Sequence, residues 1–297
     1  MDNRKKVIAL GFFDGVHLGH QPLLQKVAER SHQLDMTPAV FTFDRSPREF
    51  VTGIPVPLLT TVEERRQRVM DLFAIGDVII APFDREMMTM PWEAFVLMLA
   101  RKYQAGWLVA GHDFRFGHKN TGTPALLAEK AAQLGMGCDI IPAVTLDGIT
   151  VSSSHIRRLL EQGDVEQAAR FLGDPFSIQG SVLHGKGLGS RIGTPTVNLI
   201  PPANRLIPAR GVYITRVWVD GQVFPAITNV GVRPTVDTDG GITVESHILG
   251  QSLHLYGKDC RVEFLKMLRP EKKFGSLNEL QAQIAEDTRQ AQEYFRI

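Results

Sequence analysis

The order of apolar and polar positions divides the chain into two parts with different periodicity. Up to about residue 173, short apolar runs alternate with segments of helical spacing. The apolar runs predict strands at residues 7–10, 39–43, 78–80, 107–110 and 139–141. The helical spacing predicts helices at residues 19–34, 61–73, 91–102 and 124–134, and two short helices from about Ser154 and after Asp164. This alternation favours an α/β domain with a parallel sheet and helices on both faces.

The second part begins near Gly173-Asp174-Pro175 and consists mainly of short strands and turns. Strands are predicted at residues 176–183, 212–219, 223–229, 242–249 and 260–267. Asp220-Gly221 predicts a hairpin turn, and Ser276 predicts the cap of a last helix. Many short strands followed by one helix indicate a small closed β-barrel with a C-terminal helix. We therefore expect two domains, 1–173 and 174–297.

Composition restricts the classes of partner. The 297 residues are enough for two domains, and 43% hydrophobic and 22% charged residues are usual for a globular protein. The net charge of +1 favours neither nucleic acid nor a membrane as a partner, and no apolar run reaches membrane-spanning length. The cysteines, Cys138 and Cys260, exclude a disulfide framework. We expect a cytoplasmic protein that is a monomer or a weak homo-oligomer.

The segment GFFDGVHLGH at residues 11–20 is the most informative motif of the chain. It follows the first predicted strand and precedes a predicted helix, where parallel sheets bind phosphate. His17 and His20 can donate hydrogen bonds to phosphate oxygens, and Gly19 between them allows close approach. The alternative is that both histidines only cap the helix. The HLGH segment resembles the signature of the HxGH nucleotidylyltransferases, which transfer a nucleotidyl group from ATP and release pyrophosphate.

Two further segments follow later predicted strands of the same sheet. They are GHDFRFG at residues 111–117 and VSSSHIR at residues 151–157. Serines at a helix start are ordinary caps, but with free N–H groups and Arg157 they also suit a triphosphate. In this order, the three segments resemble the adenylyltransferase module of prokaryotic bifunctional riboflavin kinase/FAD synthetases, which implies a Rossmann-like fold.

The resemblance implies a role for individual residues of the first part. His17 and His20 are the expected catalytic residues. Asp113 and Phe114 are expected on the adenosine and flavin side of the site. Phe12 departs from the family pattern, which often has Asn or Thr there. The residues expected to bind the ATP phosphates are Gly11, Phe13, Gly19, Ser152, Ser153 and Arg157.

The second part resembles the riboflavin kinase module of the same family. The carrying segments are GSVLHGKGLG at residues 180–189, GTPTVN at 193–198, NVGVRPT at 229–235, VESH at 244–247 and LYGK at 255–258. By this resemblance Glu245 is the general base, and Thr196 and Asn198 approach Mg²⁺, which prefers oxygen ligands. Without it, Glu245 is best explained as a solvent-facing strand residue. The resemblance also places Gly185, Gly187 and Gly189 at ATP, and Asn229 and Arg233 on the flavin side.

The expected function is therefore bifunctional. One domain phosphorylates riboflavin with MgATP to FMN, and the other adenylylates FMN with ATP to FAD and pyrophosphate. Residues 250–254 replace an acidic, aromatic stretch of the family, and Ser190 precedes Arg191 in the glycine-rich loop. These departures keep open an FAD synthetase with a degenerate, flavin-binding kinase domain. A flavin sensor without turnover would leave HLGH unexplained. An adenylyltransferase for another substrate, such as phosphopantetheine, would leave the barrel unexplained.

Overall fold

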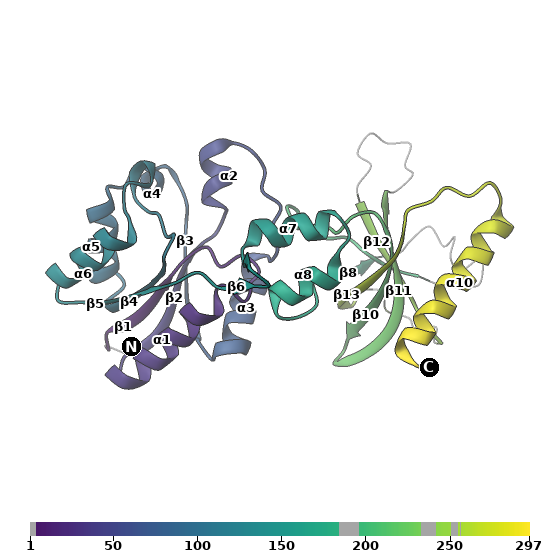
Figure 1. Cartoon of the computed structure of the whole chain (residues 1–297), viewed down its shortest axis with the longest axis horizontal. Helices are drawn as coiled ribbons and strands as arrows, with labels where there is room; N and C mark the ends of the chain where they lie inside the picture. The colour runs from purple at the N-terminus through teal and green to yellow at the C-terminus, as the bar shows by residue number, and fades with distance from the viewer. Residues whose placement is uncertain (1–3, 184–195, 233–241, 251–254, 256) are drawn as a thin grey trace. The chain divides into compact units, whose positions relative to one another are not determined.

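The computed structural model describes residues 4–183, 196–232, 242–250, 255 and 257–297. The chain divides into two compact units, Met1–Ser153 and Ser154–Ile297. Figure 1 shows the helices and strands of both units with their labels. Within the described residues, no helix is long and apolar enough to cross a membrane.

The first unit contains a five-stranded parallel sheet, as the apolar runs predict. The strand order is β3-β2-β1-β4-β5, and all four pairings are parallel. The strands are β1 (Lys6–Leu10), β2 (Thr37–Phe43), β3 (Asp77–Ala81), β4 (Ala105–Gly111) and β5 (Gly137–Ile141). The central strand β1 is an apolar run because both of its faces are buried.

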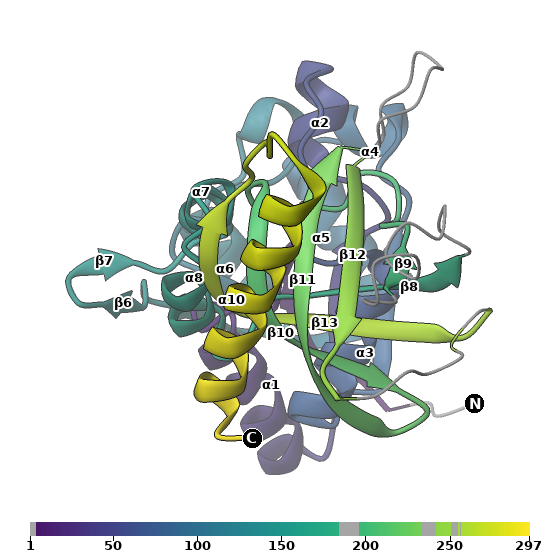
Figure 2. The same cartoon turned by 90° about the vertical axis from the view of Figure 1, so that its right-hand side faces the viewer.

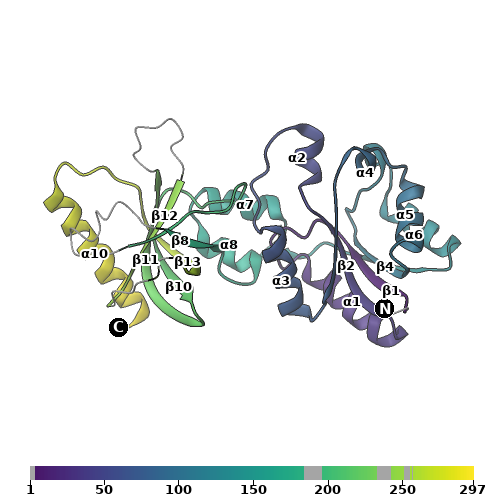
Figure 3. The same cartoon turned by 180° about the vertical axis from the view of Figure 1, so that it is seen from behind.

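Helices cover both faces of this sheet (Figure 3). Val7 and Ala9 of β1 pack in one core cluster with α1 (Gln21–Leu34) and α3 (Val62–Phe73). Ile8 and Leu10 pack in the opposite cluster with α5 (Trp92–Arg101) and α6 (Pro124–Gln133). Four short elements were not predicted: α2 (Pro47–Thr52), α4 (Arg85–Thr89), the 3₁₀ turn His118–Asn120, and the hairpin of β6 (Thr145–Leu146) and β7 (Ile149–Thr150).

The strand order decides where a ligand can bind. Strands β1 and β4 are neighbours. Strands β2 and β3 follow on the side of β1, and β5 follows on the side of β4, so the strand order reverses between β1 and β4. In open parallel sheets, ligands bind at such a switch point, beyond the carboxyl ends of the strands. The loop after β1 contains the two histidines, and the loop after β4 contains Asp113. The fold therefore brings the first two predicted motifs to one place.

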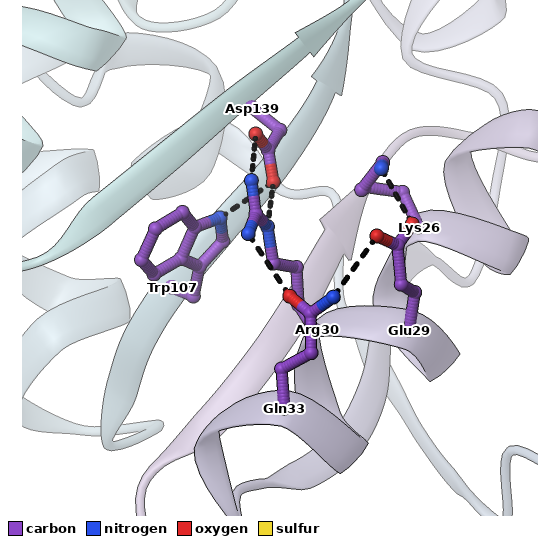
Figure 4. Close-up of polar contacts among 6 residues, drawn as sticks. All are labelled: Lys26, Glu29, Arg30, Gln33, Trp107 and Asp139. Carbon is purple, nitrogen blue, oxygen red and sulfur yellow. Dashed lines mark hydrogen bonds and ion pairs between the residues drawn. The ribbon is translucent and has the colours of Figure 1, made fainter.

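A polar cluster fastens helix α1 to the sheet beneath it (Figure 4). Arg30 of α1 donates to both carboxylate oxygens of Asp139 on β5, at 2.7 and 3.0 Å. Trp107 of β4 donates from Nε1 to Asp139 Oδ2 at 2.8 Å, and the Arg30 guanidinium lies 4.7 Å from the Trp107 ring centroid. The hydrogen bond from Arg30 is the main reason that the pKa of Asp139 is lowered. This cluster holds α1, and with it the loop that precedes α1.

The second unit contains the predicted barrel. Its closed strand order is β10-β11-β12-β9-β8-β13. The strands are β8 (Ser177–Leu183), β9 (Val197–Leu199), β10 (Gly211–Val219), β11 (Gln222–Val232), β12 (Ile242–Ile248) and β13 (Asp259–Pro270). Strand β9 was not predicted. The hairpin of β10 and β11 turns at Asp220 and Gly221. Both residues have positive φ, as a two-residue type I′ turn requires.

Three helices accompany the barrel strands along the chain. The two short helices are α7 (Ser153–Glu161) and α8 (Val165–Leu172), as expected, and α8 packs on β13. The terminal helix α10 (Leu277–Phe295) begins at Ser276, whose side chain accepts a hydrogen bond from Glu279 N–H. Helix α10 lies over β11 on the outside of the barrel (Figure 2). There Ala291 packs in one cluster with Ile214, Ile227 and Leu249.

Candidate active sites

The loop of residues 11–20 is held in a strained conformation. Phe13 and Val16 have φ angles of 55° and 45°, a region that side chains other than glycine rarely adopt. The Asp14 carboxylate, which is 1% exposed, accepts hydrogen bonds from the backbone N–H groups of Leu59 and Thr60 at 3.1 and 3.0 Å. Thr60 Oγ1 accepts in turn from Gly15 N–H at 3.0 Å. Asp14 thus fixes the loop to the segment of Leu59 and Thr60.

The two histidines of this loop form one unit with the serine segment. Their rings are stacked, with centroids 3.7 Å apart. His17 Nε2 lies 3.2 Å from Ser153 Oγ, and Ser153 Oγ donates to Asp14 C=O at 3.1 Å. A Cβ atom on Gly19 would lie 2.9 Å from the Val151 carbonyl oxygen, so only glycine fits between the histidines here. The structure therefore joins the first and third motifs.

The electrostatic setting keeps His20 neutral. Burial is the main cause that lowers its pKa well below 6.5, followed by the charges of His17 and Arg65. A neutral imidazole carries one N–H donor, and the second nitrogen is an acceptor. A neutral His20, stacked on His17, can present an N–H donor to an anion. This arrangement fits stabilisation of phosphate oxygens better than acid–base catalysis at neutral pH.

A cavity of about 520 Å³ lies in the first unit and is lined by the segments that follow β2, β3 and β4. Asp113 is largely exposed, and Phe114 stacks on Phe116 with centroids 5.4 Å apart. Phe116 is one of the cavity's lining residues. The others combine apolar and cationic groups: Pro47, Arg48, Val51, Thr52, Phe83, Met87, Met88, Gly117, His118, Lys119 and Asn120. Such a lining suits a flat aromatic ligand that carries a negative charge.

The barrel brings together residues that lie far apart in the sequence. Glu245 on β12 is paired with Asn229 on β11 and with Asn198 on β9. Directly paired residues of neighbouring strands share one face of the sheet. Because Val244 and Ser246 are buried on the other face, Glu245 belongs to the outer face of the barrel. It is therefore flanked on both sides by an asparagine amide.

This outer face forms a cavity of about 320 Å³ with helix α10. Thr196, Asn229 and Glu245 line it on the barrel side, together with Val212, Ile227 and His247. Leu280, Ile284 and Asp287 of α10 line the opposite side, and Arg269, Glu271, Lys272 and Phe274 complete it. A carboxylate at the wall of a cavity that combines apolar and charged side chains does not fit a purely solvent-facing glutamate. The arrangement supports a base that acts on a bound aromatic substrate.

The structure places the other predicted residues as follows. Gly11 and Phe13 lie in the loop after β1, with the Phe13 ring buried against His20. Ser152 precedes Ser153, and Arg157 follows one turn later in α7, within the second compact unit. Residues 190–191 and 251–254 fall outside the described part of the chain, as do the remaining predicted site residues Gly185, Gly187, Gly189 and Arg233.

Three residues near the sites were not predicted. Arg65 is buried beneath the loop of residues 11–20, and its charge acts on His20. Arg269 on β13 forms an ion pair at 2.8 Å with the buried Asp287 on α10, beside the barrel cavity. Arg65 had a usable signal, because it occupies a position of the apolar stripe of α3, four residues before the buried Val69. Arg269 and Asp287 had no such signal, because their ion pair depends on how α10 packs against the barrel.

Comparison with known proteins agrees with both halves of the chain. Residues 1–155 match the family model for FAD synthetase, and residues 172–295 match that for riboflavin kinase. The bifunctional riboflavin kinase/FMN adenylyltransferase of Pseudomonas fluorescens is 35% identical, over 96% of this chain and 92% of the relative. The protein of the same name from Escherichia coli K12 is 33% identical, over 97% and 92%.

A solved structure matches the whole fold. It is the crystal structure of a Streptococcus pneumoniae protein described as a macrolide-efflux protein. It shares 27% sequence identity with a TM-score of 0.87, and the match covers 97% of this chain and 93% of that one. The two family matches and the full-length relatives favour two active modules over a single active one. The chain belongs to the family of bifunctional riboflavin kinase/FMN adenylyltransferases.

Proposed function

We propose that the two reactions of this family are divided between the two halves of the chain, with the residue roles given below. The first half adenylylates FMN to FAD, and the second phosphorylates riboflavin to FMN. Two observations, one in each unit, support this division. Glu245 is paired with two asparagines at a cavity of the barrel, and His17, His20 and Ser153 contact one another in the first unit.

In the proposed adenylyl transfer, the FMN phosphate attacks the α-phosphorus of ATP, and pyrophosphate leaves. His17 and His20 donate hydrogen bonds to the oxygens on which negative charge develops. Gly11, Phe13 and Gly19 offer backbone close to the nucleotide, and the β- and γ-phosphates lie at Ser152, Ser153 and Arg157. No residue becomes covalently modified, because positioning and electrostatics are sufficient for phosphoryl chemistry of this kind.

We place the flavin ring of FMN in the cavity of about 520 Å³ beside Phe116. Phe83 and Phe116 supply aromatic faces, and Met87 and Met88 supply polarizable apolar contacts. Lys119 at the rim carries positive charge that complements the phosphate of FMN. Asp113 and Phe114, in the loop between this cavity and β4, then lie on the flavin and adenosine side.

In the proposed kinase reaction, Glu245 accepts the proton of the riboflavin 5′-hydroxyl as that oxygen attacks the γ-phosphorus of a second ATP. The cavity of about 320 Å³ takes the flavin ring, with Leu280 and Ile284 of α10 against it. Asn229 lies beside Glu245 and orients the hydroxyl. Gly185, Gly187, Gly189 and Arg233 keep the nucleotide and flavin roles that the family resemblance implies.

We further propose that Mg²⁺ accompanies ATP in both reactions. In the barrel, Thr196 and Asn198 offer hard oxygen atoms close to Glu245, which is the donor chemistry that Mg²⁺ prefers. Magnesium sites of kinases use few protein ligands and complete the shell with phosphate oxygens and water. When bound, the ion neutralises phosphate charge. The residues present fit that group.

The decisive experiment assays both reactions on the same preparations. His17→Ala and His20→Ala should each lower FAD formation from FMN by about 10²-fold, the usual loss for one transition-state donor. Glu245→Gln should lower FMN formation from riboflavin by about 10²-fold or more. Each variant should leave the other reaction within about twofold, because the residues belong to different modules. His32→Ala and Glu166→Gln, both at exposed positions, are the matched controls.

The assignment would be refuted if the histidine variants lost riboflavin phosphorylation and Glu245→Gln lost FAD formation. Loss of both reactions in one variant would indicate misfolding rather than catalysis. If Glu245→Gln phosphorylates riboflavin at the wild-type rate, Glu245 is a structural residue. A chain that makes FAD from FMN but never makes FMN from riboflavin would replace the bifunctional reading by the degenerate-kinase alternative.

We propose that residue 173 is the boundary between the part of the chain that forms FAD and the part that forms FMN. Fragment 1–173 should convert FMN to FAD, and fragment 174–297 should make FMN. Helix α8 packs on β13 and buries Phe171 and Leu172. A barrel fragment that starts at Ser154 should therefore melt at a higher temperature than one that starts at Asp174. Adenylylation by the C-terminal piece alone would contradict the two-module proposal.

We also propose a cytoplasmic enzyme that is a monomer or a weak homo-oligomer. Cys138 and Cys260 are both free thiols, as a reducing compartment predicts. Sedimentation at several concentrations tests the assembly state: a stable oligomer at the lowest concentration would contradict the proposal.

A further inference from the structure

Helix α3 contains a buried arginine that the proposed steps do not use. Arg65 is 1% exposed. A buried charge is costly unless an opposite charge or a full set of hydrogen bonds compensates it. Among the described residues Arg65 has no ion pair, and its Nε and Nη2 atoms are buried without a hydrogen-bond partner. This incomplete compensation requires an explanation.

The contacts that Arg65 does make lead to the loop of residues 11–20. Its Nη1 atom donates to Thr42 Oγ1 at 2.9 Å and to the Phe43 carbonyl at 3.0 Å. Thr42 Oγ1 donates in turn to the Phe12 carbonyl at 2.9 Å. The guanidinium carbon lies 4.2 Å from the centroid of the Phe12 ring. Arg65 therefore contacts Phe12 through its ring and, by way of Thr42, through its backbone.

Phe12 is also the residue that differs from the Asn or Thr that the family resemblance implies at this position. An asparagine or threonine there could make a polar contact, whereas phenylalanine offers the face of its ring. A cation over an aromatic face is attracted by the ring quadrupole, more strongly when both are desolvated. The pair of Phe12 and Arg65 thus gives the departure a physical role.

The charge of Arg65 remains available to a ligand of this loop. The Asp14 carboxylate favours the charged form of Arg65, but it is already engaged by the backbone of Leu59 and Thr60. Burial lowers the pKa of Arg65 only to about 10, so the guanidinium is charged at neutral pH. The positive charge of Arg65 contributes to the lowered pKa of His20. Phosphates that bind at His17 and His20 would compensate it.

We propose that Arg65 is a positioning residue for adenylyl transfer, which holds the loop of residues 11–20 through Phe12 and places a fixed positive charge beneath the phosphates. This inference rests on the proposed function of His17 and His20. Arg65 itself touches no substrate. It acts through the loop and through its charge, which favours the negative charge that grows during pyrophosphate release.

The test uses the full-length chain with Arg65→Met, Arg65→Lys and Phe12→Leu. Arg66→Met is the matched control, because Arg66 is exposed on the same helix. Arg65→Met should lower the kcat of FAD formation by about 30-fold, with a smaller change in the KM for ATP. Arg65→Lys keeps the positive charge and its attraction to the Phe12 ring, and it should lose less than about fivefold. Riboflavin phosphorylation and the Arg66→Met variant should stay within about twofold of wild type.

The double variant Phe12→Leu/Arg65→Met separates this role from a general structural one. If Arg65 acts through Phe12, the double variant loses much less than the product of the two single effects. An Arg65→Lys variant as slow as Arg65→Met, with its melting temperature lowered in step, would overturn the proposal. So would a wild-type rate in Arg65→Met. If that variant does not fold, a wild-type rate in Phe12→Leu refutes the inference.

The reference variant His20→Ala distinguishes a failure of the proposed function from a failure of the inference about Arg65. If His20→Ala retains FAD formation, the proposed function of the loop fails. If His20→Ala loses it and Arg65→Met does not, only the inference about Arg65 fails.

Discussion

The ion pair between Arg269 and Asp287 determines whether helix α10 can complete the barrel cavity. Asp287, on α10, accepts from Arg269 Nε at 3.1 Å to each oxygen and from Nη2 at 2.8 Å. Gln283 Nε2 also donates to Asp287, at 3.0 Å. The side chains of Asp287 and Arg269 are only 3% and 19% exposed. The perturbation is Asp287→Asn, which keeps the size of the side chain and removes its charge.

The structure sets the expected magnitude. Removing one partner of a buried ion pair costs about 3–5 kcal/mol, because the other charge stays buried. Arg269 is partly exposed, so we take the lower end, about 3 kcal/mol for the barrel unit. For a domain of this size, that lowers the melting temperature by roughly 10 °C. Since α10 contributes Leu280 and Ile284 to the cavity, the KM for riboflavin should rise at least about tenfold, which corresponds to roughly 1.4 kcal/mol of binding.

The assay combines calorimetry of the full chain with riboflavin kinase kinetics. Adenylylation of supplied FMN should be unchanged, which shows that the first unit is intact. The matched control is Glu286→Gln, which neutralises the neighbouring carboxylate on the solvent side of α10, where it pairs with Arg289. Exposed helical pairs of this kind contribute little. Equal melting temperatures and equal KM values for Asp287→Asn and Glu286→Gln would show that the ion pair does not hold α10 at the cavity.

Three further predictions concern the first unit and the thiols. Because the pKa of His20 is lowered in the folded chain, the unfolded chain binds the extra proton below about pH 6.5. The stability of the first unit should therefore fall as the pH decreases below that value, by at most about 1.4 kcal/mol per pH unit, and His20→Gln should remove this part of the dependence in urea titrations. Asp139→Asn should lower the melting temperature of the same unit by a few degrees, because Arg30 and Trp107 lose a shared acceptor. Glu29→Gln, at the exposed end of that cluster, should leave the melting temperature unchanged. Equal effects of the two substitutions would contradict the role of Asp139. Burial raises the pKa of Cys138 to about 12, so this thiol should react with a thiol reagent only after urea unfolding, and rapid labelling of the folded chain would disprove it.

Much of the secondary structure could be predicted because its signals are local. Thr61 and Glu64 form a capping box at the start of α3, and Thr123 caps α6. The hairpin at Asp220-Gly221 follows from the φ angles that its turn requires. The short helices α2 and α4 and the strand β9 were missed, because they are too short for a periodic pattern. Their conformation depends on what they pack against.

The two modules, the order of their elements and the motif residues His17, His20 and Glu245 can be inferred from the sequence alone. These rest on periodicity, turn chemistry and motif spacing, which are properties of neighbours along the chain. The contacts of His17 with Ser153, of Glu245 with its neighbours Asn198 and Asn229, and of Arg65 with Phe12 arise from the folding of distant segments onto one another. Strand order, barrel register and helix docking bring these groups together over long sequence separations. The reason is that burial of apolar faces selects one packing from many, and no single segment contains that choice.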